Sequence, residues 1–428
     1  MSTGLLLILT FAVCICLGMP IAFALGCTVV VGAATVPGLS FMTIMQTSFA
    51  AIDSFTLVAI PFFILAGEIM LKGGLSEKLI EFCQVCVGNK RGSLGIVAVI
   101  ACMIFSAISG SGPATVAAIG GLLIPAMKED GYDEGFTCSL IAAAGSMGPV
   151  IPPSILFIMY AVVTGISVTD LFIAGVLPGI VMAACLCVFC YVIARKKKYG
   201  KLDQPPFDIK DFFRALKKAI WALLVPVIIL GGIYGGFFTP TEAAIVACVY
   251  ALIVSLFIYK DLKIKDLPQI FISTGSTTGY CLAFVGAAQV LGKLLAMMKV
   301  PATITDLLVS FTDSKIVVLL LLNIVLLIIG CFMEPVSSIL IFGTLMSSIA
   351  AAFGVDPIHF GVIMIVNLVI GMCTPPVGIN MFVAAGVGGI KPENMFKWLF
   401  PCIAVLIVAL LIITYIPAIS LGLFSIFG

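Results

Sequence analysis

The chain has 428 residues, of which 62% are hydrophobic and only 10% are charged, and its formal net charge is +2. Soluble proteins carry about 25% charged residues, so this composition excludes a water-soluble protein and predicts one that spans a membrane. The single histidine, His359, argues against an enzyme built on a Ser-His or histidine–metal centre. The sequence has no phosphate-binding glycine loop and no basic patch outside its loops, so neither ATP hydrolysis nor a nucleic-acid partner is expected.

Apolar runs of about 20 residues follow one another along the chain, and each is long enough to cross a bilayer. The first run has no basic leader, so we expect a retained membrane segment and not a cleaved signal. Short loops rich in Lys and Arg stay in the cytoplasm, and three such clusters lie at Lys72–Arg91, Arg195–Lys218 and Lys260–Lys265. Placing all three there predicts ten spans, near residues 3–18, 21–36, 53–72, 136–164, 170–194, 219–237, 242–259, 274–298, 357–386 and 397–422. Five spans in each half force the second half to be inverted relative to the first, with both chain ends on the outer, periplasmic side.

Two further apolar segments, 93–127 and 316–353, are each long enough for two helices but are interrupted in the middle. The interruptions read Ser109-Gly110-Ser111-Gly112-Pro113 and Met333-Glu334-Pro335. We interpret both segments as re-entrant hairpins, the first entering from the cytoplasm and the second from outside. The alternative is two ordinary spans for each segment, which would flip later loops or place lysine clusters outside. Segments that mix charged and apolar residues are predicted to be interfacial amphipathic helices at 75–88, 208–218 and 301–310.

The two halves of the chain repeat one another. A shift of 223 positions places Gly148 on Gly371, Pro152-Pro153 on Pro375-Pro376, Gly165 on Gly388, and Pro178 on Pro401. Matching glycines and prolines are informative because each one marks a requirement of the backbone. The chain therefore reads as two repeats, at 1–205 and 206–428.

A Pro-Pro pair interrupts one apolar span in each half. Proline removes a backbone donor and clashes with the preceding turn, so 136–164 and 357–386 are predicted to be broken helices. In hydrocarbon the freed carbonyls need partners, which surrounding protein or bound ions can supply. Two such breaks at corresponding places are typical of a transporter whose site lies near the bilayer midplane.

Four interruptions, two hairpin tips and two broken spans, should meet at that site. A half-helix that ends at a break exposes carbonyls, which suit a cation, and one that starts there exposes amides, which suit a carboxylate. Hydroxyls of Ser109, Ser111 and Thr374 are candidate sodium ligands. Glu334 is the one carboxylate placed deep in the membrane, where a charge costs about 3 kcal/mol and usually marks an ion path; the alternative is a loop residue at a wrongly placed boundary. Asn380, one turn past the second Pro-Pro pair, either binds substrate or bonds a neighbouring helix.

The run from Ser109 to Gly120 resembles the large membrane subunit of TRAP transporters, the tripartite ATP-independent periplasmic family, and so do Gly354 to Gly361 and Gly371 to Asn380. The resemblance covers the whole chain. It implies an all-α, inverted-repeat carrier of the elevator type, from the ion-transporter superfamily, that uses a sodium gradient in the bacterial inner membrane. It also implies two partners: a small four-helix membrane subunit on a separate chain, and a soluble periplasmic binding protein that delivers an organic acid.

The same resemblance implies two sodium sites and no other cofactor. The first would use Ser109, Ser111, Gly148, Ile151 and Pro153, and the second Glu334, Gly371, Thr374 and Pro376. The family often has Asp-Pro where this chain has Glu334-Pro335, which keeps an acid in place but changes its reach. The expected substrate contacts are Gly112, Ser146 and Asn380.

Other functions remain open from the residues alone. One is a self-sufficient sodium/divalent-anion symporter that shares the fold and needs no binding protein. A more remote one is an intramembrane enzyme, for which one histidine and one deep glutamate offer too few groups. The residues do not distinguish a C4-dicarboxylate from sialic acid or another sugar acid as the substrate.

Overall fold

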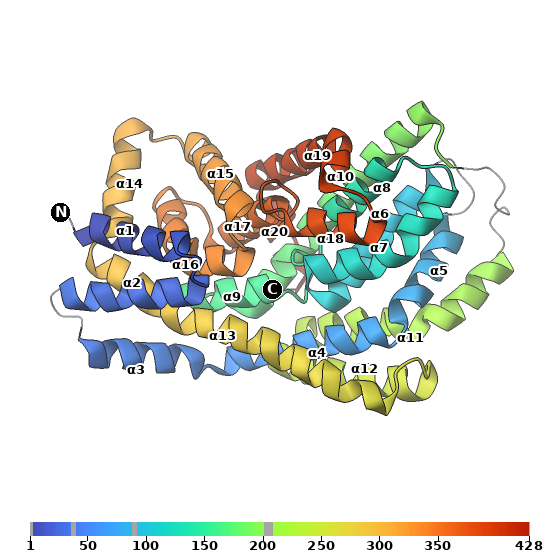
Figure 1. Ribbon diagram of the computed structural model, residues 1–428, viewed down its shortest axis with the longest axis horizontal. Coiled ribbons are helices and arrows are strands. Elements are labelled where there is room, and N and C mark those ends of the chain that lie inside the picture. Colours follow the sequence, from blue (N-terminus) through green and yellow to red (C-terminus); the bar gives the residue numbers. More distant parts are fainter. Residues whose placement is uncertain (1–2, 36–39, 88–91, 201–208, 428) are drawn as a thin grey trace.

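The computed structural model describes residues 3–35, 40–87, 92–200 and 209–427. All regular secondary structure in these ranges is helical (Figure 1). Within them, eight helices are long and apolar enough to cross a membrane: Phe55–Lys72, Val168–Lys197, Ile209–Tyr234, Pro240–Ile258, Ile264–Met297, Lys315–Phe332, Pro335–Ala352 and Pro392–Tyr415. The protein is therefore an all-helical, polytopic membrane protein. The predicted boundary at 205/206 and the basic residues Lys90, Arg91 and Lys201 lie outside the described residues.

The helices occur in the same order in the two halves. The first half contains α1 (Thr3–Cys16), α2 (Ile21–Thr35), α3 (Phe41–Ile52), the 3₁₀ turn η1 (Phe55–Val58), α4 (Ala59–Lys72), α5 (Leu75–Val87), α6 (Ser93–Ser109), α7 (Gly112–Glu129), α8 (Glu134–Gly145), α9 (Ile155–Thr164) and α10 (Val168–Lys197). The second half contains α11 (Ile209–Tyr234), α12 (Pro240–Ile253) with the π-helical turn η2 (Val254–Ile258), the 3₁₀ turn η3 (Ile264–Asp266), α13 (Leu267–Met297), α14 (Val300–Phe311), α15 (Lys315–Phe332), α16 (Pro335–Ala352), α17 (Pro357–Gly371), α18 (Ile379–Gly388), the 3₁₀ turn η4 (Pro392–Met395), α19 (Phe396–Tyr415), α20 (Ala418–Leu421) and α21 (Phe424–Phe427).

The observed helices differ from the predicted ones in three places. Helix α3 occupies a stretch to which the sequence assigned no element. Helices α1 and α2 have 14 and 15 residues, so each is about 21–23 Å long and shorter than the hydrocarbon layer. The prediction of a separate interfacial helix at 208–218 is wrong, because α11 continues from Ile209 to Tyr234. Residues 211–225 contain no glycine or proline, so nothing in the charged stretch stops the helix.

Helix α13 runs antiparallel to α3 and α4, which occupy the matching place in the first half. Near its start, α13 donates a hydrogen bond from Ser273 Oγ to Glu68 Oε1, near the end of α4, over 3.3 Å. Further along α13, the carbonyl of Gly286 accepts from Ser48 Oγ of α3, which precedes α4. Tyr160 of α9 donates to the carbonyl of Pro357, the first residue of α17, so the second half of one broken rod contacts the first half of the other.

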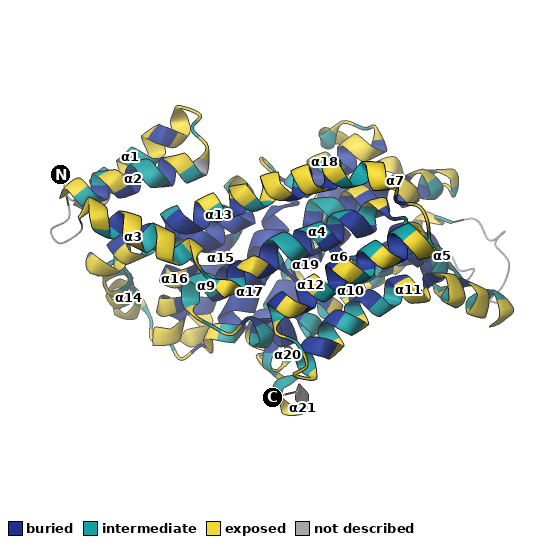
Figure 2. Ribbon diagram, turned by 90° about the horizontal axis from the view of Figure 1, so that it is seen from below, coloured by how far each residue is buried: buried dark blue, intermediate teal, exposed yellow. Residues whose placement is uncertain are grey.

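Two broken helical rods occupy the centre of the molecule. Helix α8 is buried from Gly135 to Gly145, and α17 is buried from His359 to Gly371. Figure 2 shows α17 among the buried segments at the centre, with a rim of more exposed helices such as α3 and α14 around them. Large exposed side chains on the rim are apolar, for example Phe41, Phe49 and Phe311, as expected for helices that face lipid.

Two helical hairpins lie beside the broken rods. Hairpin one is α6–α7 and hairpin two is α15–α16. The base of hairpin one lies by the end of α18, where Lys128 Nζ donates to the carbonyl of Gly388 over 2.7 Å. The base of hairpin two lies by the end of α19, where Tyr415 donates to the carbonyl of Ile316. The two bases are therefore far apart, whereas the two tips both reach the helix breaks.

Candidate functional site

Break one is the non-helical segment 146–154 between α8 and α9. It contains Pro149, Pro152 and Pro153, and the Pro152–Pro153 peptide bond is cis. Ser154 is the N-cap of α9: its hydroxyl accepts from the amide of Phe157 and donates to the carbonyl of Pro149. The chain leaves the helix because proline supplies no amide hydrogen, and Ser154 then restarts it.

Break two, residues 372–378, has the same construction between α17 and α18. The Pro375–Pro376 peptide bond is cis, as at the matching place in break one. The amide of Asn380 crosses the break and donates to the carbonyl of Met372 over 2.9 Å. Thr374 Oγ1 donates to the carbonyl of Ile370 over 2.9 Å, which leaves its lone pairs available to a cation.

The tip of hairpin one is held by its own hydroxyls. Ser109 Oγ and Thr115 Oγ1 are 2.9 Å apart, and Thr115 Oγ1 donates to the carbonyl of Ser111 over 2.8 Å. Gly110 has a φ of +58°, in the left-handed region that favours glycine. Pro113 stands in the first turn of α7, where the missing amide hydrogen costs nothing.

The tip of hairpin one packs directly against break one. A methyl group added at Gly148 would lie 2.6 Å from the backbone carbonyl atoms of Ser111. One added at Gly110 would lie 2.8 Å from the carbonyl oxygen of Pro153. The side chain of Ile151 packs on Gly179 of α10. The structure therefore brings together all five residues predicted for the first sodium site on two touching segments.

Hairpin two meets break two in the same way, but Glu334 is engaged elsewhere. Gly371 lies so close to Gly330, near the end of α15, that an added methyl group would overlap the backbone there. The amide of Val377 donates to the carbonyl of Cys331 over 3.4 Å. Glu334 caps its own helix α16, accepting from the amide and hydroxyl of Ser337 at 3.3 and 3.1 Å.

The second predicted sodium set is thus only partly assembled. Gly371, Thr374 and Pro376 share one break, while Glu334 stands at the adjoining tip. Within the described residues no hydrogen bond joins Glu334 to Thr374.

A buried junction joins the two breaks. Ser146 Oγ lies 2.8 Å from Cys373 Sγ, and Asn380 Nδ2 lies 3.3 Å from Ser146 Oγ. A methyl group added at Gly112 would lie 3.0 Å from Asn380 Oδ1, an oxygen without a hydrogen-bond partner in this part of the chain. The three residues predicted to contact substrate, Gly112, Ser146 and Asn380, therefore lie together. They are buried, and Asn380 bonds a neighbouring break, as in the structural alternative for this residue.

The donors at the two breaks are hydroxyl and carbonyl oxygens. Groups of three or more His, Cys, Asp or Glu side chains able to hold a metal ion are absent from the described ranges. Hard cations such as sodium prefer oxygen ligands, whereas zinc and copper prefer nitrogen and sulfur. The unpartnered Asn380 Oδ1 adds one more oxygen at the junction. The residues present therefore fit sodium.

A small cavity of about 170 Å³ lies beside the hairpin-one tip. It is lined by Ile64, Gly67, Glu68, Leu71, Phe105, Ser109, Ser111, Ala114, Ile155 and Thr277. Glu68 lies near the end of α4, where a carboxylate would ordinarily pair with a cation or reach the membrane interface. The structure places it beside the tip, and no periodicity or motif in the sequence signals this neighbour.

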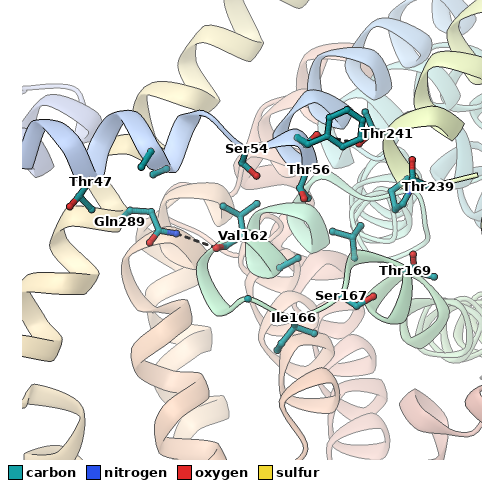
Figure 3. Close-up of a pocket in the computed structure, with 17 residues that line it drawn as sticks. Thr47, Ser54, Thr56, Val162, Ile166, Ser167, Thr169, Thr239, Thr241 and Gln289 are labelled. Atoms are coloured by element: carbon teal, nitrogen blue, oxygen red, sulfur yellow. Dashed lines mark hydrogen bonds between the residues drawn. The ribbon is translucent and has the colours of Figure 1, made fainter.

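A larger cleft of about 790 Å³ opens where several helices start (Figure 3). Its lining comes from the segments around η1, the α9–α10 turn, the start of α12, and α3 and α13. Polar groups on it are neutral, among them Thr47, Ser54, Thr56, Ser167, Thr169, Thr239, Thr241 and Gln289. Gln289 Nε2 donates to the carbonyl of Val162 across the cleft over 3.2 Å. None of the residues predicted for the site lies in this cleft.

Comparison with known proteins adds independent evidence. The sequence profile of the family described as "Tripartite ATP-independent periplasmic transporter, DctM component" matches residues 8–419. The C4-dicarboxylate TRAP transporter large permease protein DctM of Pseudomonas aeruginosa is 44% identical, covering 88% of this chain and 87% of that protein. The sialic acid TRAP transporter large permease protein SiaM of Vibrio cholerae is 36% identical, covering 96% of each.

One further match is to a longer protein, and another is to a solved structure that is similar in fold alone. The isethionate TRAP transporter permease protein DctMQ of Oleidesulfovibrio alaskensis is 42% identical over 96% of this chain, and the chain spans 65% of its length. Among solved structures, the Alcanivorax borkumensis YdaH transporter superposes with a TM-score of 0.57, covering 89% of this chain and 88% of that one. At 12% identity this match supports the fold alone.

Proposed function

Because the chain belongs to the DctM component family of tripartite ATP-independent periplasmic transporters, we propose that it takes up an organic acid by sodium-coupled symport. The relatives are named as transporter permeases, so the chain is a transporter and not an enzyme. Its relatives are named for isethionate, C4-dicarboxylates, 2,3-diketo-L-gulonate and sialic acid, all of which are organic anions. An organic acid is therefore the substrate class we assign to it.

The single observation that carries sodium coupling is the meeting of two hairpin tips and two helix breaks. At each break one half-helix ends and another begins, so carbonyl oxygens and amide groups face the same place. Oxygen atoms suit the cation and amide groups suit the carboxylate of the substrate. Sodium bound there would offset the charge of the substrate in a site that excludes water.

We assign the motion to an elevator mechanism between two inverted repeats, 1–205 and 206–428. The antiparallel packing of α13 against α3 and α4, which occupy the matching place in the first half, supports the inversion. The broken rods and hairpins form the moving part, because they carry the breaks together. The rim, where α12 packs on α4 and α13 packs on α2 and α3, forms the fixed part.

The chain is placed in the bacterial inner membrane with both ends on the periplasmic side. This orientation follows from the basic clusters at Lys72–Arg91, Arg195–Lys218 and Lys260–Lys265, which belong in the cytoplasm. The proposed partners are a small membrane subunit on a separate chain and a periplasmic binding protein. The family description, which names a tripartite periplasmic system, supports both.

Uptake into vesicles tests this function. The permease is reconstituted with its small subunit, and labelled organic acids are supplied with the binding protein under an inward sodium gradient. We expect uptake that needs sodium and the binding protein together. Uptake by this chain without a binding protein would instead establish the self-sufficient symporter, and uptake unaffected by replacing sodium with choline would refute sodium coupling.

Thr374→Ala tests the second sodium site in the same vesicles. Losing one ligand oxygen at a cost of about 1–1.5 kcal/mol should raise the sodium concentration for half-maximal uptake about tenfold. Thr305→Ala on the peripheral helix α14 is the matched control and should leave it unchanged. Equal sodium dependence in both variants would remove Thr374 from the site.

A further inference from the structure

The cavity beside hairpin one is built from both the rim and the hairpin. Gly67 of α4 faces the end of α6, where an added methyl group would touch Ser109 at 3.5 Å. The next residue, Glu68, lines the cavity together with Ser111 of the hairpin and Thr277 of α13. The carboxylate therefore lies beside the hairpin tip, in a cavity that also borders Ile155 at the end of break one.

Glu68 is half-buried and has little to balance its charge. Among the described residues, its carboxylate accepts one hydrogen bond, from Ser273 Oγ at 3.3 Å. Among the residues that the structure describes, no Lys, Arg or His lies within 4 Å of it. A carboxylate held in a membrane helix without a cationic partner is typical of an ion path.

The other polar groups of the cavity are free to bind a cation. Ser273 and Thr277 are one turn apart on α13, so both face α4. In the described part of the chain, neither the Ser111 hydroxyl nor the Thr277 hydroxyl has a hydrogen-bond partner. A cavity of about 170 Å³ has room for a sodium ion with several water molecules.

We propose that this cavity is a transit site for sodium, in which the Glu68 carboxylate and the hydroxyls of Ser111 and Thr277 bind the ion on its way to or from the hairpin-one tip. The proposal rests on the sodium coupling proposed above. Because Glu68 and Thr277 belong to the rim and Ser111 to the hairpin, the site is complete only while these two parts face each other. The ion thereby has a charged binding site at the interface between the rim and the moving part.

The effect of sodium on thermal unfolding of the purified permease tests the proposal without transport. Sodium chloride is titrated against choline chloride at constant ionic strength, and the unfolding midpoint is followed. Glu68→Gln should raise the sodium concentration for half of the maximal shift about tenfold, since one charged ligand is lost. Thr277→Val should raise it about threefold, because a neutral hydroxyl binds the ion more weakly.

Two matched controls isolate the site. Glu77→Gln changes an exposed carboxylate on α5, and Thr278→Val removes a hydroxyl next to Thr277 that already lacks a partner. Both should overlay the wild type. If Glu68→Gln and Glu77→Gln show the same sodium dependence of the unfolding midpoint, while the wild type responds to sodium, the transit site is refuted and sodium coupling is left intact. Vesicle uptake by the wild type that is independent of sodium would instead overturn the coupling itself.

Discussion

Gly148 and Gly371 occupy the same place in the two halves, and each lies where a hairpin backbone comes closest to a break. Any side chain there would meet Ser111 in the first half or Gly330 in the second. Their φ angles are ordinary, so close approach and not backbone freedom requires glycine at both positions.

Gly148→Ala and Gly371→Ala should therefore separate hairpin from break. Forcing one methyl group into such a contact typically costs about 1–3 kcal/mol, and the displaced tip should abolish uptake. Gly386→Ala, on an exposed face of α18 with nothing within 4 Å, is the control and should behave as wild type. Thermal unfolding and vesicle uptake check both effects, and normal uptake by Gly371→Ala would show that the tip has freedom to move aside.

The sequence predicts residue types at this site better than it predicts neighbours. Pro-Pro pairs and glycines indicate a required backbone conformation, and this can be recognised from the sequence alone. The contact between Ser146 and Cys373 joins residues 227 positions apart, and no local pattern announces it. The position of Glu68 beside the hairpin-one tip could not be predicted for the same reason, because hydropathy gives the span but not what faces a residue across the fold.

At the scale of elements, the predicted helix boundaries agree with the structure where glycine or proline marks them in the sequence. The all-helical membrane class followed from composition, and most spans lie near the predicted places. Helix α11 was divided in the prediction because its first part is charged and its second apolar. A helix tolerates that change in polarity, since only glycine, proline or a competing cap ends it.

Lys128 ties hairpin one to α18. Its ammonium donates to the carbonyl of Gly388, the last residue of α18, and lies 3.3 Å from Glu134. Lys128→Met should lower the free energy of unfolding by about 1–2 kcal/mol, because a cation at a helix C-terminus and a charged hydrogen bond are both lost. Denaturant unfolding measures this; Lys265→Met, on an exposed turn, should stay within about 0.5 kcal/mol of wild type. If Lys128→Met and Lys265→Met lower the free energy of unfolding equally, the contact between Lys128 and α18 has no special role in stability.

At the scale of the whole molecule, α19 separates the bases of the two hairpins. Hairpin one contacts the chain just before α19 begins, and hairpin two contacts Tyr415 at its end. The 20 residues of α19 span about 30 Å, the thickness of the hydrocarbon layer. The bases should thus lie on opposite faces of the membrane.

Labelling with a membrane-impermeant maleimide checks this arrangement. The background is a chain in which the exposed Cys16 and Cys86 are replaced by serine. Asp313→Cys should then be labelled in cells whose outer membrane is permeabilised and whose inner membrane is intact. Glu129→Cys, at the base of hairpin one, should label only after the inner membrane is permeabilised. Equal labelling of both variants in intact cells would contradict the predicted topology.

Helix α13 is a long helix on which several others pack. Its 31 residues give a rod of about 46 Å, half again as long as the oily layer is thick. Such a rod either leans or projects beyond one surface. Since α2, α3, α4 and α16 all pack on it, the way this long rod meets the membrane constrains how each of these four helices can lie.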